Sequence, residues 1–236
     1  MVAGRYLIVN ADDFGQSYGV SQGIIEAHEH GIVTSASLMV RWPAASAAAA
    51  YAQKHSTFSL GLHFDFAEWT YRDATWVCQY EVVRGDDPQA VAEEIARQLA
   101  AFRLLVGRDP THLDSHQHAH REEPFRSALI QLARELAIPV RHFSPDIRYC
   151  GNFYGQTGTG APIPEAISVD HLTETLEGLA PGLTELGCHP GYGHDLQSMY
   201  CRERAWEVKT LCDPRVRQVL SAERIELRSF SQLTGS

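Results

Sequence analysis

The chain is poor in features that mark several common protein classes. Its 20 Lys and Arg residues are outnumbered by 29 Asp and Glu, its formal net charge is -9, and it has no basic block. These numbers argue against a nucleic-acid partner or an anionic membrane surface. No run approaches the roughly 20 apolar residues of a membrane span, and no signal-like segment precedes the first apolar run. We therefore expect a cytoplasmic protein that acts on a neutral or cationic small molecule.

Cysteine pairs with the spacing of a redox or zinc motif are also missing. The 5 cysteines form no Cys-x-x-Cys pair, and their number is odd. This argues against a disulfide framework and against a thiolate zinc site. We expect free thiols in a reducing compartment.

What the chain does have is a regular alternation of strand-like and helix-like segments. Its 236 residues are 44% hydrophobic, so we expect a single domain over residues 1–236, and an α/β barrel is ordinary at this length. The alternation predicts parallel strands with right-handed crossovers. We expect irregular structure at 64–87 and a long functional loop at 144–164. The predicted strands are 6–9, 34–40, 58–63, 111–116, 140–142, 184–189 and 225–230, and the predicted helices are 17–30, 43–54, 88–106, 124–137, 169–180 and 198–211.

Residues with carboxylate and imidazole side chains gather where these strands end. Asp12 and Asp13 follow the first strand, and His63, His116 and His189 each close a later one. Because ligands of parallel α/β sheets collect at the carboxyl ends of the strands, we expect these side chains to meet. Buried Asp and His cost several kcal/mol unless they are paired or ligated, so a structural core would use apolar residues there. The pattern predicts a divalent-metal hydrolase site.

The two adjacent carboxylates suit complementary roles. If Asp12 and Asp13 are both ionised within a few ångströms, their charges repel, and a metal ion relieves the repulsion. One of them can bind a cation while the other accepts a proton from water. An ordinary turn or helix cap is the structural alternative. His63 fits a ligand in the same context, and His189 can act as a general acid toward a leaving amine.

A run of histidines crosses the end of the fourth predicted strand. In an extended chain each two-residue step is about 6.6 Å, so the members of one face cannot all reach one ion. We choose His116 as the ligand and Asp114 as support one layer below it. His118 and His120 are expected to line the pocket from the following loop. The alternative is a helical pair of His116 and His120, as in zinc proteases, although Gln117 stands where that motif has Glu. The residues that share the face are His112, Asp114, His116, His118 and His120.

Other polar and aromatic residues are ambiguous from the sequence. Asp65 and Glu68 lie in the predicted irregular segment and are expected to be solvated. The aromatic residues of the same segment would either stack on sugar rings or cover the core, and both readings stay open; they are Trp69, Tyr71 and Trp76. Glu185 shares a face with His189 but lies about 13 Å from it along an extended strand. It therefore cannot orient His189 directly, but it could pair with Arg141.

Five segments, taken in order, resemble the motifs of the YdjC-like carbohydrate deacetylases, a family that includes chitooligosaccharide deacetylases. The resemblance spans nearly the whole chain, and the joint pattern is highly specific. It implies a distorted (β/α) barrel that resembles a TIM barrel, with the site at the C-terminal ends of parallel strands. It also implies hydrolysis of an acetamido group on an amino sugar. The segments are Asn10-Ala11-Asp12-Asp13-Phe14-Gly15, Gly31-Ile32-Val33-Thr34-Ser35, Gly61-Leu62-His63, Thr111-His112-Leu113-Asp114-Ser115-His116-Gln117-His118-Ala119-His120 and Glu185-Leu186-Gly187-Cys188-His189-Pro190-Gly191-Tyr192.

The resemblance also implies roles for individual residues. Asp13, His63 and His116 would bind the metal ion. Asp12 would be the general base, and His189 the acid or a group that stabilises the intermediate. The second group of expected site residues would bind substrate or support the ligands, and consists of Asp114, His118, His120 and Tyr192.

The cofactor implied by the resemblance is one divalent ion, Mg²⁺ or Zn²⁺, with Co²⁺ and Ni²⁺ as alternatives. Two imidazoles and one carboxylate suit Zn²⁺, Co²⁺ or Ni²⁺ better than Mg²⁺. The expected partner is a small N-acetylated sugar, and the family suggests a homodimer. The chain departs from the expected pattern at Arg121-Glu122-Glu123, which would alter one wall of the pocket.

Two other functions compete with amide hydrolysis. A metal-dependent phosphoesterase would usually need more carboxylates, a second metal ion and a phosphate-binding Arg or Lys. A His-rich metal-binding protein without catalysis is compatible with 12 histidines, but their placement on separate strand ends does not favour it.

Overall fold

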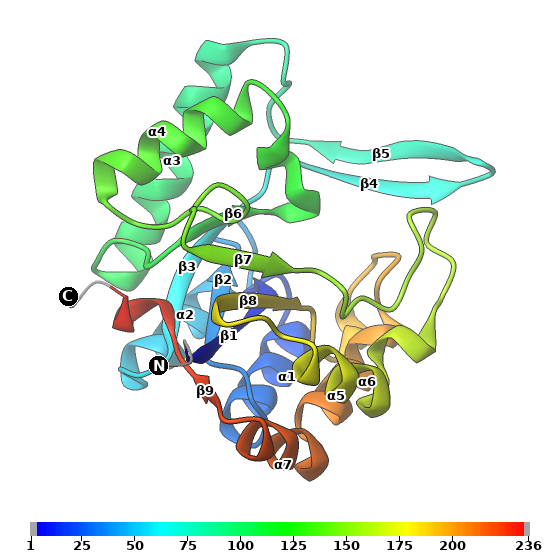
Figure 1. The fold of residues 1–236 in the computed structure, drawn as a ribbon. Helices are drawn as coiled ribbons and strands as arrows, with labels where there is room; N and C mark the ends of the chain where they lie inside the picture. The colour runs from blue at the N-terminus through cyan, green and yellow to red at the C-terminus, as the bar shows by residue number, and fades with distance from the viewer. Residues whose placement is uncertain (1–3, 234–236) are drawn as a thin grey trace.

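The computed structural model describes residues 4–233, and a parallel sheet lies at its centre (Figure 1). The sheet consists of β1 (Arg5–Phe14), β2 (Ser35–Leu38), β3 (Ser59–Phe64), β6 (Leu113–Ser115), β7 (Ile147–Cys150), β8 (Gly182–Cys188) and β9 (Ile225–Leu227). The spatial order is β6-β3-β2-β1-β8-β7, with β9 paired to β1. Every pair is parallel. The predicted α/β fold with a curled, barrel-like parallel sheet is confirmed.

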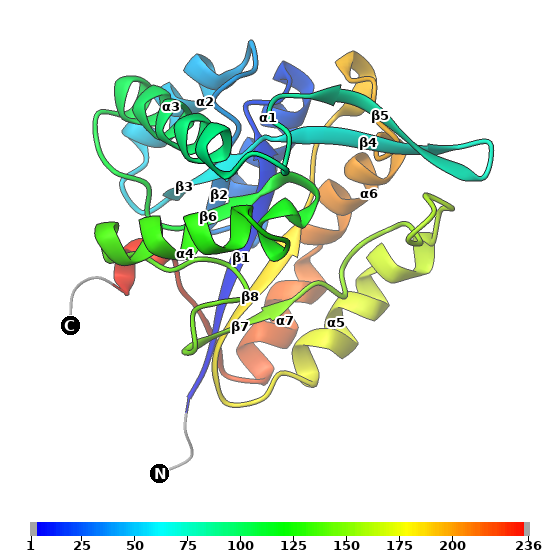
Figure 2. The same cartoon turned by 90° about the horizontal axis from the view of Figure 1, so that it is seen from above.

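Helices pack around this sheet on its outer side, as Figure 2 shows from above. They begin and end where the sequence carries capping signals. Asp87 caps α3 through the backbone N–H groups of residues 89 and 90, Pro88 occupies the first turn, and Gly107 ends the helix in a left-handed conformation. The helices are α1 (Tyr18–Glu29), α2 (Ala45–Lys54), α3 (Pro88–Val106), α4 (Phe125–Leu136), α5 (Val169–Glu177), α6 (Arg202–Leu211) and α7 (Pro214–Ala222).

The prediction of irregular structure over 64–87 is wrong. This segment contains an antiparallel hairpin of β4 (Ala67–Arg72) and β5 (Thr75–Glu81), which projects from the body of the molecule in Figure 1. Its two-residue turn places Asp73 and Ala74 at φ 50° and φ 60°. Such turns usually carry Asn-Gly or Asp-Gly, so Asp-Ala gave no clear hairpin signal.

Four further segments differ from the prediction. The expected loop over 144–164 contains β7, a short strand whose residues are mostly half-buried. The last helix, α7, was not predicted, although Asp213 caps it and Pro214 occupies its first turn. Helix α6 begins at Arg202 rather than at 198. The predicted strand at 140–142 is reduced to one bridge between Val140 and Leu113.

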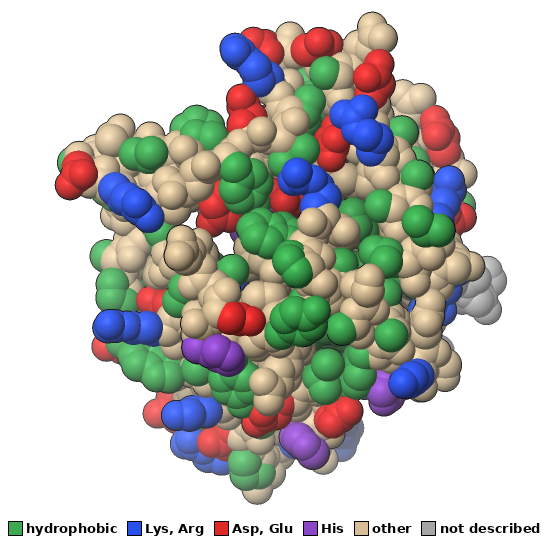
Figure 3. All heavy atoms as spheres, turned by 180° about the vertical axis from the view of Figure 1, so that it is seen from behind, with side chains coloured by type: hydrophobic (Ala, Val, Ile, Leu, Met, Phe, Trp, Pro, Cys, Tyr) green, Lys and Arg blue, Asp and Glu red, His purple; other side chains and the backbone are tan. Residues whose placement is uncertain are grey.

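The surface and the thiols agree with the composition. Acidic and basic side chains are interspersed on the face shown in Figure 3, as expected for a chain without a basic block. All the cysteines lie in the described part of the chain and are free thiols, as predicted. Within residues 4–233, no helix has both the length and the apolar character needed to cross a membrane.

Candidate active site

A bulge at the end of β1 brings two consecutive carboxylates to the same cavity. The register with β2 shifts between Ala11 and Phe14, so Asp12 and Asp13 together oppose one residue of β2. Asp13 adopts φ 66°, which Asp tolerates better than most residues. Neighbours in a regular strand point to opposite faces, but here both carboxylates line one cavity. Bulges often redirect a side chain in this way beside an active site.

Asp13, His63 and His116 meet at this cavity from three separate elements. Asp13 Oδ1 lies 3.3 Å from His63 Nε2 and 3.0 Å from His116 Nδ1. One ligand atom from each of the three residues lies within 4.8 Å of the others. His63 comes from β3, and His116 follows β6 directly. The three residues expected to bind one ion are therefore neighbours in space.

Each of these three side chains is held by a second charged group. His63 Nδ1 lies 2.8 Å from Asp114 Oδ1, because the two residues are in register on the paired strands β3 and β6. His116 Nε2 lies 2.5 Å from Glu68 Oε2. Arg204 Nη2 donates to Asp13 Oδ2 at 2.6 Å. Partners of this kind fix the ring orientation and the basicity of metal ligands.

The charges in this group reinforce one another. Burial alone would raise the pKa of Asp13, but Arg204 and His116 outweigh it and hold the pKa well below its usual range. Burial would lower the pKa of His63, but Asp114 raises it to about 9. The pKa of His116 is also held well above its usual value, since Asp13 and Glu68 outweigh burial.

A buried arginine lies beneath the site and binds several carboxylates. Arg141 Nη1 donates to Asp12 Oδ2 at 2.6 Å and Nη2 to Asp12 Oδ1 at 2.7 Å. It also lies 2.8 Å from Asp114 and donates Nε–H to Glu185 at 2.7 Å. Burial would raise the pKa of Asp12, but Arg141 outweighs it, so Asp12 is ionised and fixed in orientation. The pairing of Glu185 with Arg141 agrees with the alternative weighed from the sequence.

His189 faces Asp12 across the cavity. Its Nε2 lies 3.7 Å from Asp12 Oδ2, and its buried Nδ1 has no hydrogen-bond partner among the described residues. Burial lowers the pKa of His189 to about 4, so the resting imidazole is neutral at neutral pH. Its backbone N–H donates to Glu207 at 2.5 Å. Burial raises the pKa of Glu207 to about 8.

The cavity has a volume of about 510 Å³, and the hairpin forms one of its walls. Glu68, Trp69 and Trp76 all line it. The prediction that Asp65 and Glu68 are solvated is wrong, since they are 0% and 5% exposed. Asp65 accepts hydrogen bonds from Arg41, Trp42 and Tyr80, and Glu68 meets His116, so pairing offsets the cost of burial.

The hairpin is attached to the histidine segment by a reciprocal amide pair. The backbone N–H of Trp69 donates to Gln117 Oε1 at 3.0 Å, and Gln117 Nε2 donates to the Trp69 carbonyl at 2.8 Å. Trp69 and Trp76 are 40% and 46% exposed, so neither covers the core. Tyr71 is half-buried and packs edge-on against Trp76.

The histidine run is not the helix of a zinc protease. Residues 116–121 form a short 3₁₀ segment, η1, that is broken at Gln117 and His118, which have φ 49° and φ 53°. The alternative pairing of His116 with His120 is therefore wrong. His118 lines the cavity, whereas His120 is fully buried and Ser115 Oγ lies 2.7 Å from its Nδ1.

Asp114 and Tyr192 lie elsewhere than expected. Asp114 supports His63 rather than His116, because it pairs in register with His63. Tyr192 does not line the cavity, since its hydroxyl donates to Glu26 of α1 at 2.6 Å. Arg121, in the segment that departs from the expected pattern, does line the cavity.

Sequence reasoning missed Arg204 and Glu68 and gave Arg141 only one partner. Arg204 lies on α6, whose pattern is dominated by charged residues, so nothing singles it out. It is nevertheless 1% exposed. Counting unpaired acids at the strand ends would have pointed to buried arginines, because buried charges need partners.

Comparisons with known proteins agree with this geometry. A carbohydrate deacetylase from Geobacillus stearothermophilus is 31% identical over 97% of this chain and 98% of its own length. A chitooligosaccharide deacetylase from Serratia marcescens is 30% identical over 97% of this chain and 99% of its own length.

Solved structures share the fold. One from Enterococcus faecalis, described as a candidate cellobiose-phosphate cleavage protein, has a TM-score of 0.79 at 24% identity and covers 98% of this chain and 99% of its own. A family 4 carbohydrate esterase from Streptomyces lividans, in complex with acetate, has a TM-score of 0.57 at 14% identity and covers 99% and 97%. The model of the YdjC-like proteins matches residues 6–222. The chain therefore belongs to the YdjC-like protein family.

Proposed function

We propose that this protein is a metal-dependent hydrolase that removes the acetyl group from an N-acetylated amino sugar or oligosaccharide. One observation carries the proposal: in a member of the YdjC-like family, residues from four strand ends converge on one cavity. They are Asp12, Asp13, His63, His116 and His189. Relatives over almost the full chain are named carbohydrate deacetylase and chitooligosaccharide deacetylase, which supports the substrate class.

The residues at the cavity fit a divalent metal ion. Asp13, His63 and His116 offer one carboxylate and two imidazoles whose ligand atoms lie within 4.8 Å of one another. This donor set suits Zn²⁺, Co²⁺ or Ni²⁺ better than Mg²⁺. The outward nitrogens of both imidazoles meet carboxylates, as is usual around metal-ligating histidines. When bound, such an ion would supply Lewis acidity toward the acetyl carbonyl.

The remaining residues supply proton transfer. Asp12 is ionised, and Arg141 donates a hydrogen bond to each of its carboxylate oxygens. The carboxylate is therefore fixed in orientation and can accept a proton from the attacking water. His189 is neutral at rest and lies 3.7 Å from Asp12. It therefore acts as an acid toward the departing amine only after it gains a proton during turnover.

The exposed aromatic residues of the hairpin suit a sugar ring. Trp69 and Trp76 line the cavity and present 40% and 46% of their surface. Aromatic faces exposed in a pocket offer large, rigid contact area. We infer that the hairpin contacts the sugar beyond the one that loses its acetyl group.

Acetate release from N-acetylglucosamine, chitobiose and longer chitooligosaccharides tests the proposal. The enzyme is assayed after chelation and after return of Mg²⁺, Zn²⁺, Co²⁺ or Ni²⁺. Metal-dependent acetate release is expected from at least one substrate. A parallel panel of phosphodiesters and phosphomonoesters would favour the competing phosphoesterase if only that panel reacts.

The Asp12→Asn variant tests the base. It keeps the size of the side chain and should abolish turnover while metal binding, measured by equilibrium dialysis, persists. Full activity in this variant would refute the role of Asp12 as base. Glu81→Gln, on the exposed part of β5, is the matched control and should keep full activity.

Three expectations from the sequence stay proposals. We propose a cytoplasmic location, a homodimer and a single domain, although residues 1–3 and 234–236 of that domain lie outside the described residues. Cell fractionation, light scattering and a single cooperative unfolding transition would test them in turn.

A further inference from the structure

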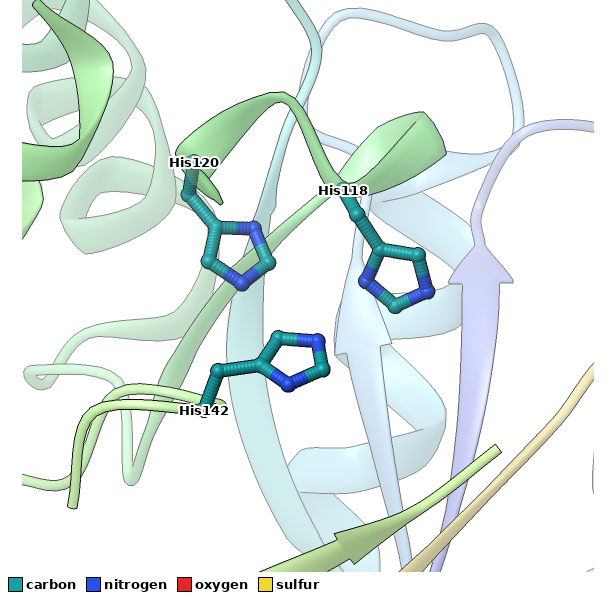
Figure 4. A group of neighbouring side chains, drawn as sticks. All are labelled: His118, His120 and His142. Atoms are coloured by element: carbon teal, nitrogen blue, oxygen red, sulfur yellow. The ribbon is translucent and has the colours of Figure 1, made fainter. Parts of the chain in front are cut away.

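A second group of imidazoles lies beside the first site. His118 and His120 belong to η1. His142 directly follows Arg141, which pairs with the buried carboxylates. Figure 4 shows the three rings gathered around a common space, with a ring nitrogen of each directed toward it. The ring centroids lie 5.2 to 5.8 Å apart. One nitrogen from each ring lies within 4.8 Å of the other two.

Two nitrogens in this group lack the partner that buried polar atoms normally have. His118 Nδ1 and His120 Nε2 are buried and make no hydrogen bond among the described residues. His120 is 0% exposed, so no bulk solvent compensates its unpaired nitrogen. Its other nitrogen lies 2.7 Å from Ser115 Oγ, which also accepts the backbone N–H of His120. The ring is thereby oriented with Nε2 toward the other imidazoles.

The backbone is strained at two of the three positions. His118 has φ 53° and His142 has φ 68°. The left-handed region is uncommon for residues other than Gly, and such conformations gather at functional sites. With ordinary negative φ values, the side chains of His118 and His142 would leave the backbone in other directions.

We propose that His118, His120 and His142 form a second metal site that takes a divalent transition-metal ion of the zinc class. It is separate from the site of Asp13, His63 and His116, called the Asp13 centre below. Three imidazoles with an open fourth position are a known zinc arrangement, and imidazole ligands also suit Co²⁺, Ni²⁺ and Cu²⁺. A hard ion such as Mg²⁺ is disfavoured, because no oxygen ligand belongs to the group.

At most a small closure of the rings is needed to bind such an ion. Tetrahedral ligation at a metal–nitrogen distance of about 2.1 Å places ligand nitrogens about 3.4 Å apart. The ligand nitrogens lie within 4.8 Å of one another, so reaching this separation needs a shift of no more than about 1.4 Å. The exposed ring of His142 can move without disturbing the core, whereas His120 is fixed by Ser115.

The site shares the cavity of the first centre. His118 and His142 line it together with Asp12, Asp13 and His63. A second ion held by His118 and His142 would therefore lie at the edge of the same cavity. Metal binding by these three histidines can be measured whether or not the protein releases acetate.

Metal stoichiometry tests the inference. The purified protein and its His142→Asn variant are dialysed to equilibrium against Co²⁺ and analysed by elemental mass spectrometry. Asn tolerates the left-handed conformation of position 142, so the exposed substitution should not disturb folding. The wild type should hold one more Co²⁺ per chain than the variant, and the difference absorption spectrum should show the bands of low-coordinate Co²⁺.

A matched control removes an exposed imidazole elsewhere. His194 lies on the surface in the short 3₁₀ segment η3 (Gly193–Asp195). His194→Asn should retain the full Co²⁺ content of the wild type. Equal Co²⁺ content in the wild type and His142→Asn would overturn the proposal. A loss of the same size in His194→Asn would also overturn it, because it would indicate non-specific binding.

Discussion

Arg141 and His142 are adjacent in the chain but belong to opposite kinds of environment. Arg141 is 4% exposed and binds Asp12, Asp114 and Glu185 at 2.6 to 2.8 Å. His142 is exposed and contacts other rings, with no hydrogen bond of its side chain among those described. The first environment is complete without a ligand, and the second is not.

This difference separates two ways of preparing the metal sites that we propose. The site of Asp13, His63 and His116 is prepared by charged partners, since Asp114, Glu68 and Arg204 each hold one of these proposed ligands. The imidazole group is prepared by backbone conformation and one serine. Changes in the first should therefore affect folding and affinity together, whereas a change at the exposed His142 of the second should affect affinity alone.

The largest effect on stability is expected when Arg141, which pairs with three buried carboxylates, is replaced. Arg141→Met should lower the free energy of unfolding by about 3–5 kcal/mol, because it leaves buried carboxylates without their cation. Chemical denaturation of the metal-free protein would measure this. Arg134→Met on the exposed part of α4 is the matched control, with an expected change within about 0.5 kcal/mol. Similar values for both variants would show that the network contributes little to stability.

A smaller effect is expected where one ligand loses its support. Glu68→Gln should weaken metal binding at the Asp13 centre by about 10–100-fold, since outer partners of ligating histidines have effects of that size. Competition with a chromophoric chelator would measure the affinity. Glu93→Gln, an exposed change of the same kind on α3, should leave it unaltered. An unchanged metal affinity in Glu68→Gln would show that Glu68 does not support metal binding.

A third prediction concerns Glu207, a buried acid that is hydrogen-bonded rather than paired with an arginine. Glu207 accepts hydrogen bonds from the Tyr200 hydroxyl and the His189 N–H. Burial raises its pKa from 4.5 to about 8. The folded chain then binds the proton more tightly than the unfolded chain, so this contribution to stability is complete below pH 4.5 and is lost as the pH rises through 8.

Glu207→Gln should remove that pH dependence. The free energy of unfolding of the wild type, relative to the variant, should fall as the pH rises from 5 to 8, with a limiting slope of about 1.4 kcal/mol per pH unit. Parallel curves for the two proteins would mean that Glu207 is already ionised in the folded chain.

The smallest effect on stability is expected at the second site. His142→Asn should change the free energy of unfolding by no more than about 0.5 kcal/mol in the presence of a chelator, since the side chain is exposed. Addition of Zn²⁺ should stabilise the wild type more than the variant, because a ligand stabilises the state that binds it. Equal stabilisation of both proteins by Zn²⁺ would show that His142 does not take part in metal binding.

The positions of the main strand ends could be predicted because parallel α/β folds gather polar residues there. The convergence of Asp12, His63 and His189 follows from that rule. The bulge could not be predicted, because it depends on the register between β1 and β2. For this reason the sequence could not show how two consecutive Asp side chains reach one cavity.

The partners of Asp13 and His116 were harder to predict, because they come from distant elements. Glu68 lies on a hairpin whose Asp73-Ala74 turn carries no strong signal. Arg204 is 191 residues from the Asp13 that it binds. Periodicity describes a local segment, whereas these contacts depend on packing between segments.

The amide pair between Gln117 and Trp69 has a consequence for how this protein can diversify. The hairpin is not part of the central sheet, and Gln117 links it to the segment that carries the histidines. Insertions or deletions at the hairpin tip would reshape the outer rim of the cavity while the ionic network below remains in register. Substrate range can therefore drift among descendants of this chain without a matching change in the reaction.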